Sequence, residues 1–428
     1  MNQRDARPFG LSSATALVVA SMVGTGVFTT SGLLLEVLKS PVRVLIAWLL
    51  GGLIAGCGAL SYGALARRFP ESGGEYLYIS RILHPAAGCV AGWISLLVGF
   101  SAPLAASAYG FGEYLSPWLL SSSPQLTGSL LLFGIAWLHG FLRQGGSWVQ
   151  NLAVVINLLL LMGFLLLAWP QLPGLTHDAP VIAGFEWGPF LTSLIWVSYS
   201  YSGWNAAVYI GGEVRNPERN LPRALFLGTG LVTLLYLALN FVFVYSAEPV
   251  SLAGRVDIGR AVAESLGGPA WADFVTWLVA FALSISVSAL MMAGPRVYAR
   301  MARDGFLPRW FDMYEDGSPR RAVILQCVLA LLLLWSLGFR DLLTFIGFTL
   351  GLSSAVAIVG LMILRIREGL AFHVAGWPWV PALYLTAVLA MTISVMVRQP
   401  PGILLGLSLV LGGWWFWFQR SGEKVERT

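Results

Sequence analysis

The chain has 428 residues, of which 57% are hydrophobic and only 11% are charged, whereas about a quarter of the residues in ordinary soluble domains carry a charge. Together with a mean hydropathy of +0.74, this composition excludes a soluble enzyme and leaves no room for a separate catalytic domain or a nucleic-acid-binding module. The net charge of +5, from 26 basic and 21 acidic residues, is therefore best explained by how the chain is oriented in a membrane and contacts its surface. We expect an all-α integral membrane protein.

Apolar runs punctuated by proline, glycine and arginine predict twelve helices, each near the length of about 20 residues that a bilayer requires. In chain order they span residues 10–38, 43–67, 86–115, 127–143, 146–169, 187–213, 222–246, 270–300, 321–338, 341–364, 377–397 and 402–418. The first five fill residues 10–169, the next five fill 187–364, and the last two fill 377–418. Residues 1–9 and 419–428 are expected to be tails.

The basic residues predict the orientation of the chain. With twelve spans both termini share one side of the membrane, and twenty of the 26 basic residues fall on that side, against six on the other. Basic residues accumulate on the cytoplasmic side of membrane proteins, so we expect both tails to be cytoplasmic and the protein to lie in the plasma (inner) membrane. Contact with lipid headgroups accounts for these charges, and we expect no nucleic-acid partner.

Two of the predicted spans carry small and polar residues near mid-membrane. The first contains Gly24-Thr25-Gly26, and the sixth contains a run from Ser198 to Asn205 that includes Gly203. Helix propensity is weak at such residues, so both helices are expected to unwind there. Paired interruptions in the two halves of a chain indicate a transporter's binding site between inverted repeats, although a Gly-x-Gly sequence also serves as a packing notch for a neighbouring helix.

The ends of broken helices favour particular ligand groups. The free N–H groups of a half-helix that begins near Gly26 favour a carboxylate, and unpaired carbonyls near Met22, Tyr199 and Ser202 favour an ammonium group. These two groups together form the head of an α-amino acid. Since neither break contains an ionisable residue, a neutral amino acid balances better than a charged one or a polyamine.

Four segments resemble motifs of the amino acid–polyamine–organocation superfamily, and most of all its L-type amino-acid transporter-like members. They are Gly24–Phe28, Phe69–Tyr78, Gly203–Ala224 and Pro295–Pro308, in the order and at the spacing of that superfamily. The resemblance implies a LeuT-like fold, with ten helices in a 5+5 inverted repeat, two further helices, and unwound first and sixth helices. It also implies transport by alternating access.

The resemblance also implies roles for individual residues. The amides of Gly24, Thr25 and Gly26 would hold the carboxylate of the substrate, and the carbonyls of Met22, Tyr199 and Ser202 would receive its amine. The implied site is completed by Val23, Ser200 and Gly203.

Two gates are expected around this site. Tyr199 matches an aromatic gate over the substrate, with an ordinary core aromatic as the alternative. The predicted cytoplasmic gate consists of Glu213, Arg215 and Arg219, with Glu75 and Arg303 opposite. Solvated loop charges are the alternative explanation for that cluster.

Departures from the superfamily pattern concern the coupling ion and partners. Asn157 stands where several members carry a lysine linked to coupling, and an asparagine cannot titrate, so an exchanger or facilitator is favoured. Ser284, Ser286 and Ser288 offer oxygens for sodium, but serines more often bond between helices. No cysteine lies between Ser116 and Gln125, so we expect no disulfide-linked accessory subunit.

The predicted function is secondary-active transport of neutral amino acids, by exchange or facilitated movement. A proton- or sodium-coupled symporter, an exporter, and a receptor that does not transport remain open, although the tail Ser421–Thr428 is short for a signalling segment. Four histidines on separate segments provide no cluster for enzymatic chemistry, so we expect no catalytic residue, metal or cofactor. Whether the protein is a monomer or a homodimer is left open.

Overall fold

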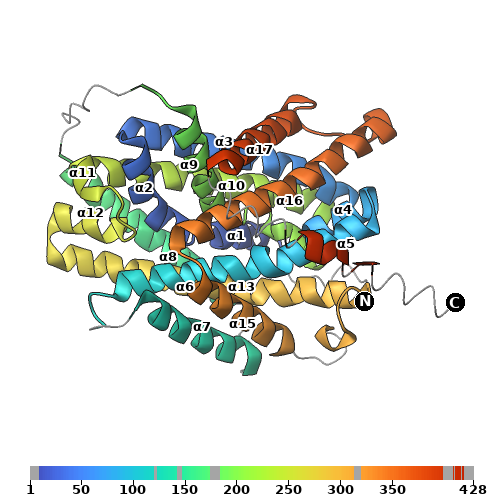
Figure 1. Cartoon of the computed structure of the whole chain (residues 1–428), viewed down its shortest axis with the longest axis horizontal. Coiled ribbons are helices and arrows are strands. Elements are labelled where there is room, and N and C mark those ends of the chain that lie inside the picture. Colours follow the sequence, from blue (N-terminus) through green and yellow to red (C-terminus); the bar gives the residue numbers. More distant parts are fainter. Residues whose placement is uncertain are drawn as a thin grey trace.

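The computed structural model describes residues 9–119, 123–141, 147–173, 184–312, 320–398, 408, 410–415 and 417–418, without the side chains of 147–151. These residues are almost entirely helical, as predicted, and the helices form one bundle (Figure 1). Residues 1–8 and 419–428 of the predicted tails, and residues 402–407, 409 and 416 of the predicted twelfth helix, 402–418, lie outside the described residues.

In the first half of the chain, helices occupy the places of the first five predicted spans. They are α1 (Leu11–Met22), α2 (Thr25–Leu38), α3 (Pro41–Arg68), α5 (Pro85–Ile94), α6 (Ala102–Leu115), α7 (Pro124–Phe141) and α8 (Ser147–Ala168). The third predicted span, 86–115, is not a uniform α-helix, because a π-helical segment, η1 (Ser95–Ser101), joins α5 to α6.

The second half repeats this order of long elements. They are α9 (Trp187–Ser200), η3 (Ala206–Glu213), α10 (Pro217–Tyr245), α13 (Pro269–Arg303), α15 (Arg320–Ser336), α16 (Phe339–Glu368) and α17 (Trp379–Arg398). Eight helical stretches among the described residues are long and apolar enough to cross a membrane. The helices α7, α9 and α15, at the fourth, sixth and ninth predicted spans, are shorter, with 18, 14 and 17 residues.

Three short helices were not predicted from the sequence. They are α4 (Gly74–Ile82), α11 (Pro249–Leu252) and α12 (Ile258–Gly267). Single turns of 3-10 helix also lie at η2 (Trp169–Gln171), η4 (Arg309–Phe311) and η5 (Gly369–Ala371). The prediction of helices relied on apolar runs about as long as a membrane span, and all of these segments are much shorter than that.

A buried aromatic cluster joins the helices that carry the two breaks. The ring of Trp48 on α3 lies 5.8 Å from that of Tyr201 and 5.3 Å from that of Tyr236 on α10, measured between centroids. The Trp48 indole donates a hydrogen bond of 2.9 Å to Ser31 on α2, which in turn contacts the Asn240 amide on α10. The Trp48 and Tyr236 rings pack edge to face and the Trp48 and Tyr201 rings are tilted, and such aromatic pairs stabilise the contact between the elements that carry them.

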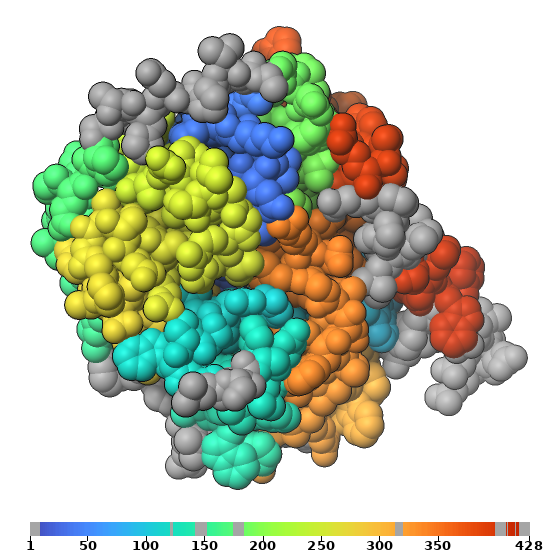
Figure 2. All heavy atoms as spheres, turned by 60° about the vertical axis from the view of Figure 1, so that its left-hand side comes forward, coloured from blue at the N-terminus to red at the C-terminus, as the bar shows by residue number. Residues whose placement is uncertain are grey.

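At one end of the bundle, the segment that contains α11 and α12 covers α2 (Figure 2). The Gly254 amide donates a hydrogen bond of 2.7 Å to the Gly32 carbonyl. A Cβ atom at Gly32 would lie 2.0 Å from the Arg255 carbonyl oxygen. Only glycine therefore allows α2 to approach this covering segment so closely.

Candidate functional site

The first break separates α1 from α2. Helix α1 ends at Met22, Val23 and Gly24 leave the helical conformation, with ψ angles of 85° and −154°, and α2 begins at Thr25. Within the described part of the chain, the amides of Thr25 and Gly26 donate to no backbone carbonyl. The N-terminus of α2 therefore presents free N–H donors at the break.

The second break follows α9. This helix ends at Ser200, a turn runs through Asn205, and the chain continues as the 3-10 helix η3. Gly203 has a φ angle of +97°, and a Cβ atom there would lie 2.6 Å from the Ser21 carbonyl oxygen. Glycine is therefore required both by the backbone angle and by the closeness of the first break.

Direct contacts hold the two breaks together. A Cβ atom at Gly26 would lie 2.5 Å from the Cα atom of Ser200, and the hydroxyls of Thr30 and Ser200 are 3.1 Å apart. The Tyr236 hydroxyl contacts the Met22 carbonyl and lies 3.0 Å from the Ser200 carbonyl. Since a phenol carries one proton, it donates to one of these carbonyls at a time and so bridges both breaks.

A cavity lies between the two breaks, with about 600 Å³ of empty space including its opening to solvent. Eight of the nine predicted binding residues line it: Met22, Gly24, Thr25, Gly26, Tyr199, Ser200, Ser202 and Gly203. Val23 is buried and does not line the cavity. The lining contains no aspartate, glutamate, lysine, arginine or histidine, so the cavity suits a ligand without net charge.

The predicted acceptor carbonyls are partly used within the protein. The Met22 carbonyl contacts the Tyr236 hydroxyl, and the Tyr199 carbonyl accepts a bond of 2.8 Å from the Ser202 amide. Each carbonyl oxygen has a second lone pair. The Ser202 carbonyl accepts no hydrogen bond from the residues described, so it is the most available of the three.

Several cavity residues escaped sequence analysis. The Thr25 hydroxyl donates a bond of 2.9 Å to Ser107 on α6, and both residues line the cavity with Phe100, Asn205 and Tyr209. Nothing in the apolar pattern distinguishes Tyr236 or Ser107 from other residues of their helices. In the third predicted span, the residues that could have indicated a departure from a regular α-helix are Gly99 and Pro103. Gly99 lies within the π-helical segment η1, and Pro103 lies at the start of α6.

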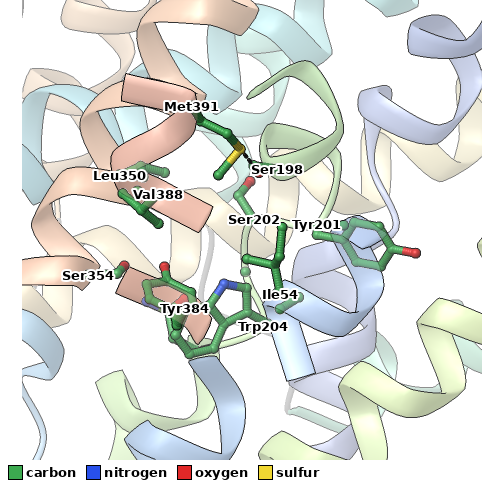
Figure 3. A pocket seen from close by; sticks show the side chains of 16 residues that line it. Ile54, Ser198, Tyr201, Ser202, Trp204, Leu350, Ser354, Tyr384, Val388 and Met391 are labelled. Atoms are coloured by element: carbon green, nitrogen blue, oxygen red, sulfur yellow. Dashed lines mark hydrogen bonds between the residues drawn. The ribbon is translucent and has the colours of Figure 1, made fainter. Parts of the chain in front are cut away.

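A second cavity, with about 540 Å³ of empty space including open solvent, also borders the unwound segment after α9 (Figure 3). The Trp204 and Tyr384 rings pack edge to face beside it, and the Ser198 hydroxyl lies 3.5 Å from the Met391 sulfur. The two cavities share Ser202, Gly203 and Asn205. The unwound segment between α9 and η3 therefore borders both cavities.

The predicted coupling positions do not form one cluster of free oxygens. Ser286 lines the first cavity, whereas the Ser284 hydroxyl donates to the Ala280 carbonyl at 2.8 Å on its own helix. Ser288 lies 2.8 Å from the His139 ring nitrogen. Asn157 is 4% exposed, and its side-chain oxygen has no hydrogen-bond partner within the described residues.

The charges of the predicted cytoplasmic gate pair differently from the expectation. Glu213 forms an ion pair of 3.1 Å with Arg296 on α13, and Arg303 pairs with Asp312 at 3.2 Å. Arg215 is exposed, and its amide donates to the Phe9 carbonyl at 2.8 Å. The prediction placed Arg303 opposite Glu213, but Arg296 lies two turns nearer the cavity on the same helix.

Comparisons with known proteins identify the family to which the chain belongs. The chain matches the family model described as amino acid permease over residues 9–411. It is 27% identical to the mouse large neutral amino acids transporter small subunit 2, over 95% of this chain and 80% of the relative. It is 25% identical to the mouse Asc-type amino acid transporter 1, with the same coverage, and 24% identical to the mouse b(0,+)-type amino acid transporter 1, over 96% and 87%. The chain therefore belongs to the amino acid permease family, whose members are multi-pass membrane transporters of amino acids and not enzymes.

Proposed function

We propose that this protein carries neutral amino acids across the membrane by alternating access. The observation that carries the proposal is the cavity in which the free amides of α2 face the end of α9, with no charged side chain in the lining. The amides suit a carboxylate and the carbonyls suit an ammonium group. A zwitterion with an uncharged side chain satisfies both without leaving a buried charge unpaired.

The proposed architecture is a LeuT-like 5+5 inverted repeat within twelve spans. Two observations support it: each half of the chain contributes five long elements in the same order, and the first element of each half is the broken one. Binding sites at such paired breaks are typical of transporters built from inverted repeats.

The proposed mode of transport is exchange or facilitated movement without an ion gradient. Asn157 supplies no titrating cation. Of the three serines considered for sodium, only Ser286 lines the first cavity, whereas Ser284 bonds within its own helix and Ser288 contacts His139. The transporters to which this chain is similar include one named for large neutral amino acids, in agreement with an uncharged substrate.

The proposed location is the plasma (inner) membrane, with both termini in the cytoplasm. The distribution of basic residues between the two faces supports this orientation. The proposed partners are the substrate and the lipid bilayer, without a disulfide-linked accessory subunit.

Ligand-induced stabilisation of the purified protein tests the substrate class, because a ligand that binds only the folded state raises the melting temperature. We expect leucine or alanine to raise it, and lysine and glutamate to leave it unchanged. Two truncated compounds serve as controls: 3-methylbutylamine lacks the carboxylate of leucine, and 4-methylpentanoate lacks its amine. Equal stabilisation by lysine, or by either truncated compound, would contradict the proposal.

A further inference from the structure

Glu75, on the short helix α4, carries a buried carboxylate beside the first cavity. It is 3% exposed. One carboxylate oxygen accepts a hydrogen bond of 3.0 Å from the Tyr62 hydroxyl and a second bond from the Asn205 amide nitrogen. The other oxygen accepts a bond of 2.7 Å from the Tyr209 hydroxyl.

All three of these donors are neutral. Across the residues that the structure describes, no lysine, arginine or histidine forms an ion pair with Glu75. A buried carboxylate without a counter-charge costs free energy unless its hydrogen bonds are fully made. The free-energy cost of burying the Glu75 carboxylate therefore points to a functional role for it.

The partners of Glu75 connect it to the cavity wall. Tyr62 belongs to α3, whereas Asn205 ends the unwound segment after α9 and Tyr209 lies on η3, which follows it. Asn205 and Tyr209 both line the first cavity, and Asn205 lines the second cavity as well. Glu75 therefore lies directly behind the part of the cavity wall that Asn205 and η3 form.

The network determines which way the Asn205 amide points. Its nitrogen donates to Glu75 and lies 3.2 Å from the Tyr209 hydroxyl, so both N–H groups have acceptors. A carboxylate accepts hydrogen bonds and donates none, so the amide must turn its nitrogen toward Glu75. The amide oxygen then points away from Glu75 and bonds to none of the described residues. Asn205 is 9% exposed, at the cavities that it lines.

We propose that Glu75 is a positioning residue for substrate recognition, which holds the Asn205 amide so that its oxygen is a fixed acceptor for the ammonium group of the substrate. The inference rests on the proposed function, because it concerns the same cavity. It adds an acceptor from a side chain to the backbone carbonyls at the two breaks. The Glu75 carboxylate acts only through Asn205 and does not touch the substrate.

A double-mutant cycle on the full-length protein tests this role. Dissociation constants are measured by calorimetry for leucine and alanine, and for 2-hydroxy-4-methylpentanoate and lactate, which carry a hydroxyl in place of the ammonium group. Glutamine at position 75 keeps the volume of glutamate but offers a donor as well as an acceptor, so Asn205 gains a second orientation. The variants are Glu75→Gln, Asn205→Ala and their combination.

We expect Asn205→Ala to weaken amino-acid binding by more than about tenfold, the range for a hydrogen bond to a charged group. Glu75→Gln should weaken it less, by about three- to tenfold, because Asn205 is still present. The combined variant should bind no more weakly than Asn205→Ala alone, because residues that act through one another are not additive. The hydroxy acids should lose less than the amino acids. Leucine uptake should show a raised KM with little change in the maximal rate.

Tyr78→Phe is the matched control. Tyr78 lies on the same short helix and is fully buried, but its hydroxyl has no hydrogen-bond partner among the described residues. Its removal should leave all four dissociation constants unchanged. If Glu75→Gln does not fold, Tyr209→Phe removes one of the two acceptors of the Asn205 amide and should weaken amino-acid binding in the same direction.

Three results would overturn the inference: additive losses in the cycle, equal losses for amino acids and hydroxy acids, or unchanged binding in Glu75→Gln. Failure of the proposed function has a different signature, because the wild-type protein itself would then bind neither leucine nor alanine. That result would overturn both proposals.

Discussion

Gly26 allows the two breaks to lie in direct contact. Its replacement by alanine changes the packing at the site but keeps the hydrogen-bond donor. Alanine keeps the amide N–H but adds a Cβ atom 2.5 Å from the Cα atom of Ser200. Forcing an extra carbon into a packed contact costs about 1–3 kcal/mol. We therefore expect Gly26→Ala to lower the melting temperature and to abolish most uptake.

Gly230→Ala is a suitable control for that prediction. Gly230 lies on α10, and a Cβ atom there would meet nothing within 4 Å. Alanine favours helix over glycine by about 1 kcal/mol, so this variant should be as stable as the wild type or more so. Full uptake by Gly26→Ala would show that the close approach of the breaks is not needed.

For single residues, the sequence predicted those that form the two breaks better than those that pack around them. Gly24, Gly26 and Gly203 were identifiable because glycine and small polar residues interrupt otherwise apolar runs. Tyr236 and Ser107 were not, because each lies in an ordinary helical pattern and acquires its role only when another helix packs against it. The orientation of the Asn205 amide likewise depends on Glu75, which is 130 residues away in the sequence.

Among the elements, the ion pair between Glu213 and Arg296 joins the end of η3 to α13. Both side chains keep part of their exposure, so the pair should contribute no more than about 1 kcal/mol to stability. A bond of that size still shifts an equilibrium between two conformations by up to about fivefold. We expect Glu213→Gln to change the maximal rate of uptake by about twofold or more while leaving the melting temperature nearly unchanged.

The matched variant for this experiment is Glu368→Gln. It breaks the ion pair of 3.1 Å with Arg68, which lies between α3 and α16 and is likewise partly exposed. This variant should retain the uptake rate of the wild type. Identical rates for both variants and the wild type would mean that the Glu213 pair is only a solvated surface contact.

The long helices were predictable and the short ones were not. Helices such as α3 and α16 have 28 and 30 residues and contain long apolar stretches, so hydropathy alone locates them. By contrast, α4 and α12 have 9 and 10 residues and mix charged with apolar positions. The positions of α4 and α12 depend on contacts with distant elements, such as the contacts of Glu75 with α3 and η3. No local sequence pattern reveals such contacts.

For the molecule as a whole, Tyr114 ties three elements together at the end covered by α11 and α12. Its hydroxyl donates a bond of 2.7 Å to the Phe28 carbonyl on α2 and accepts one of 3.1 Å from the Gly259 amide on α12. Loss of both should cost about 1–3 kcal/mol. We expect Tyr114→Phe to lower the melting temperature measurably.

Tyr245→Phe provides the comparison for Tyr114→Phe. Tyr245 is half-buried at the end of α10, and its hydroxyl bonds to none of the residues that the structure describes. Its removal should therefore leave the melting temperature unchanged. A similar loss of stability in both variants would argue against a specific tie at Tyr114.

The first cavity is closed toward α2 and less so toward the end of α13. Thr25, Ser107 and Ser200 are buried, whereas Leu290 and Ala293 are half-buried. With the proposed orientation, the accessible end faces the cytoplasm. In a protein without its three native cysteines, we expect a membrane-impermeant maleimide to label Ala293→Cys faster in inside-out than in right-side-out vesicles, and Ser107→Cys slowly in both.

The labelling experiment also tests the orientation of the chain. Faster labelling of Ala293→Cys in right-side-out vesicles would contradict cytoplasmic termini together with the proposed direction of opening. Equal labelling at both positions would contradict the closure of the cavity toward α2.

The central claim is that an uncharged amino acid moves through this cavity without an ion gradient. Uptake of labelled leucine and alanine into proteoliposomes, either empty or preloaded with the same compound and with no proton or sodium gradient, tests it most directly. We predict uptake that is much faster into preloaded vesicles for an exchanger, or similar in both for a facilitator, and no uptake of lysine or glutamate. Uptake that begins only when a proton or sodium gradient is imposed, or that favours a charged amino acid, would contradict the claim.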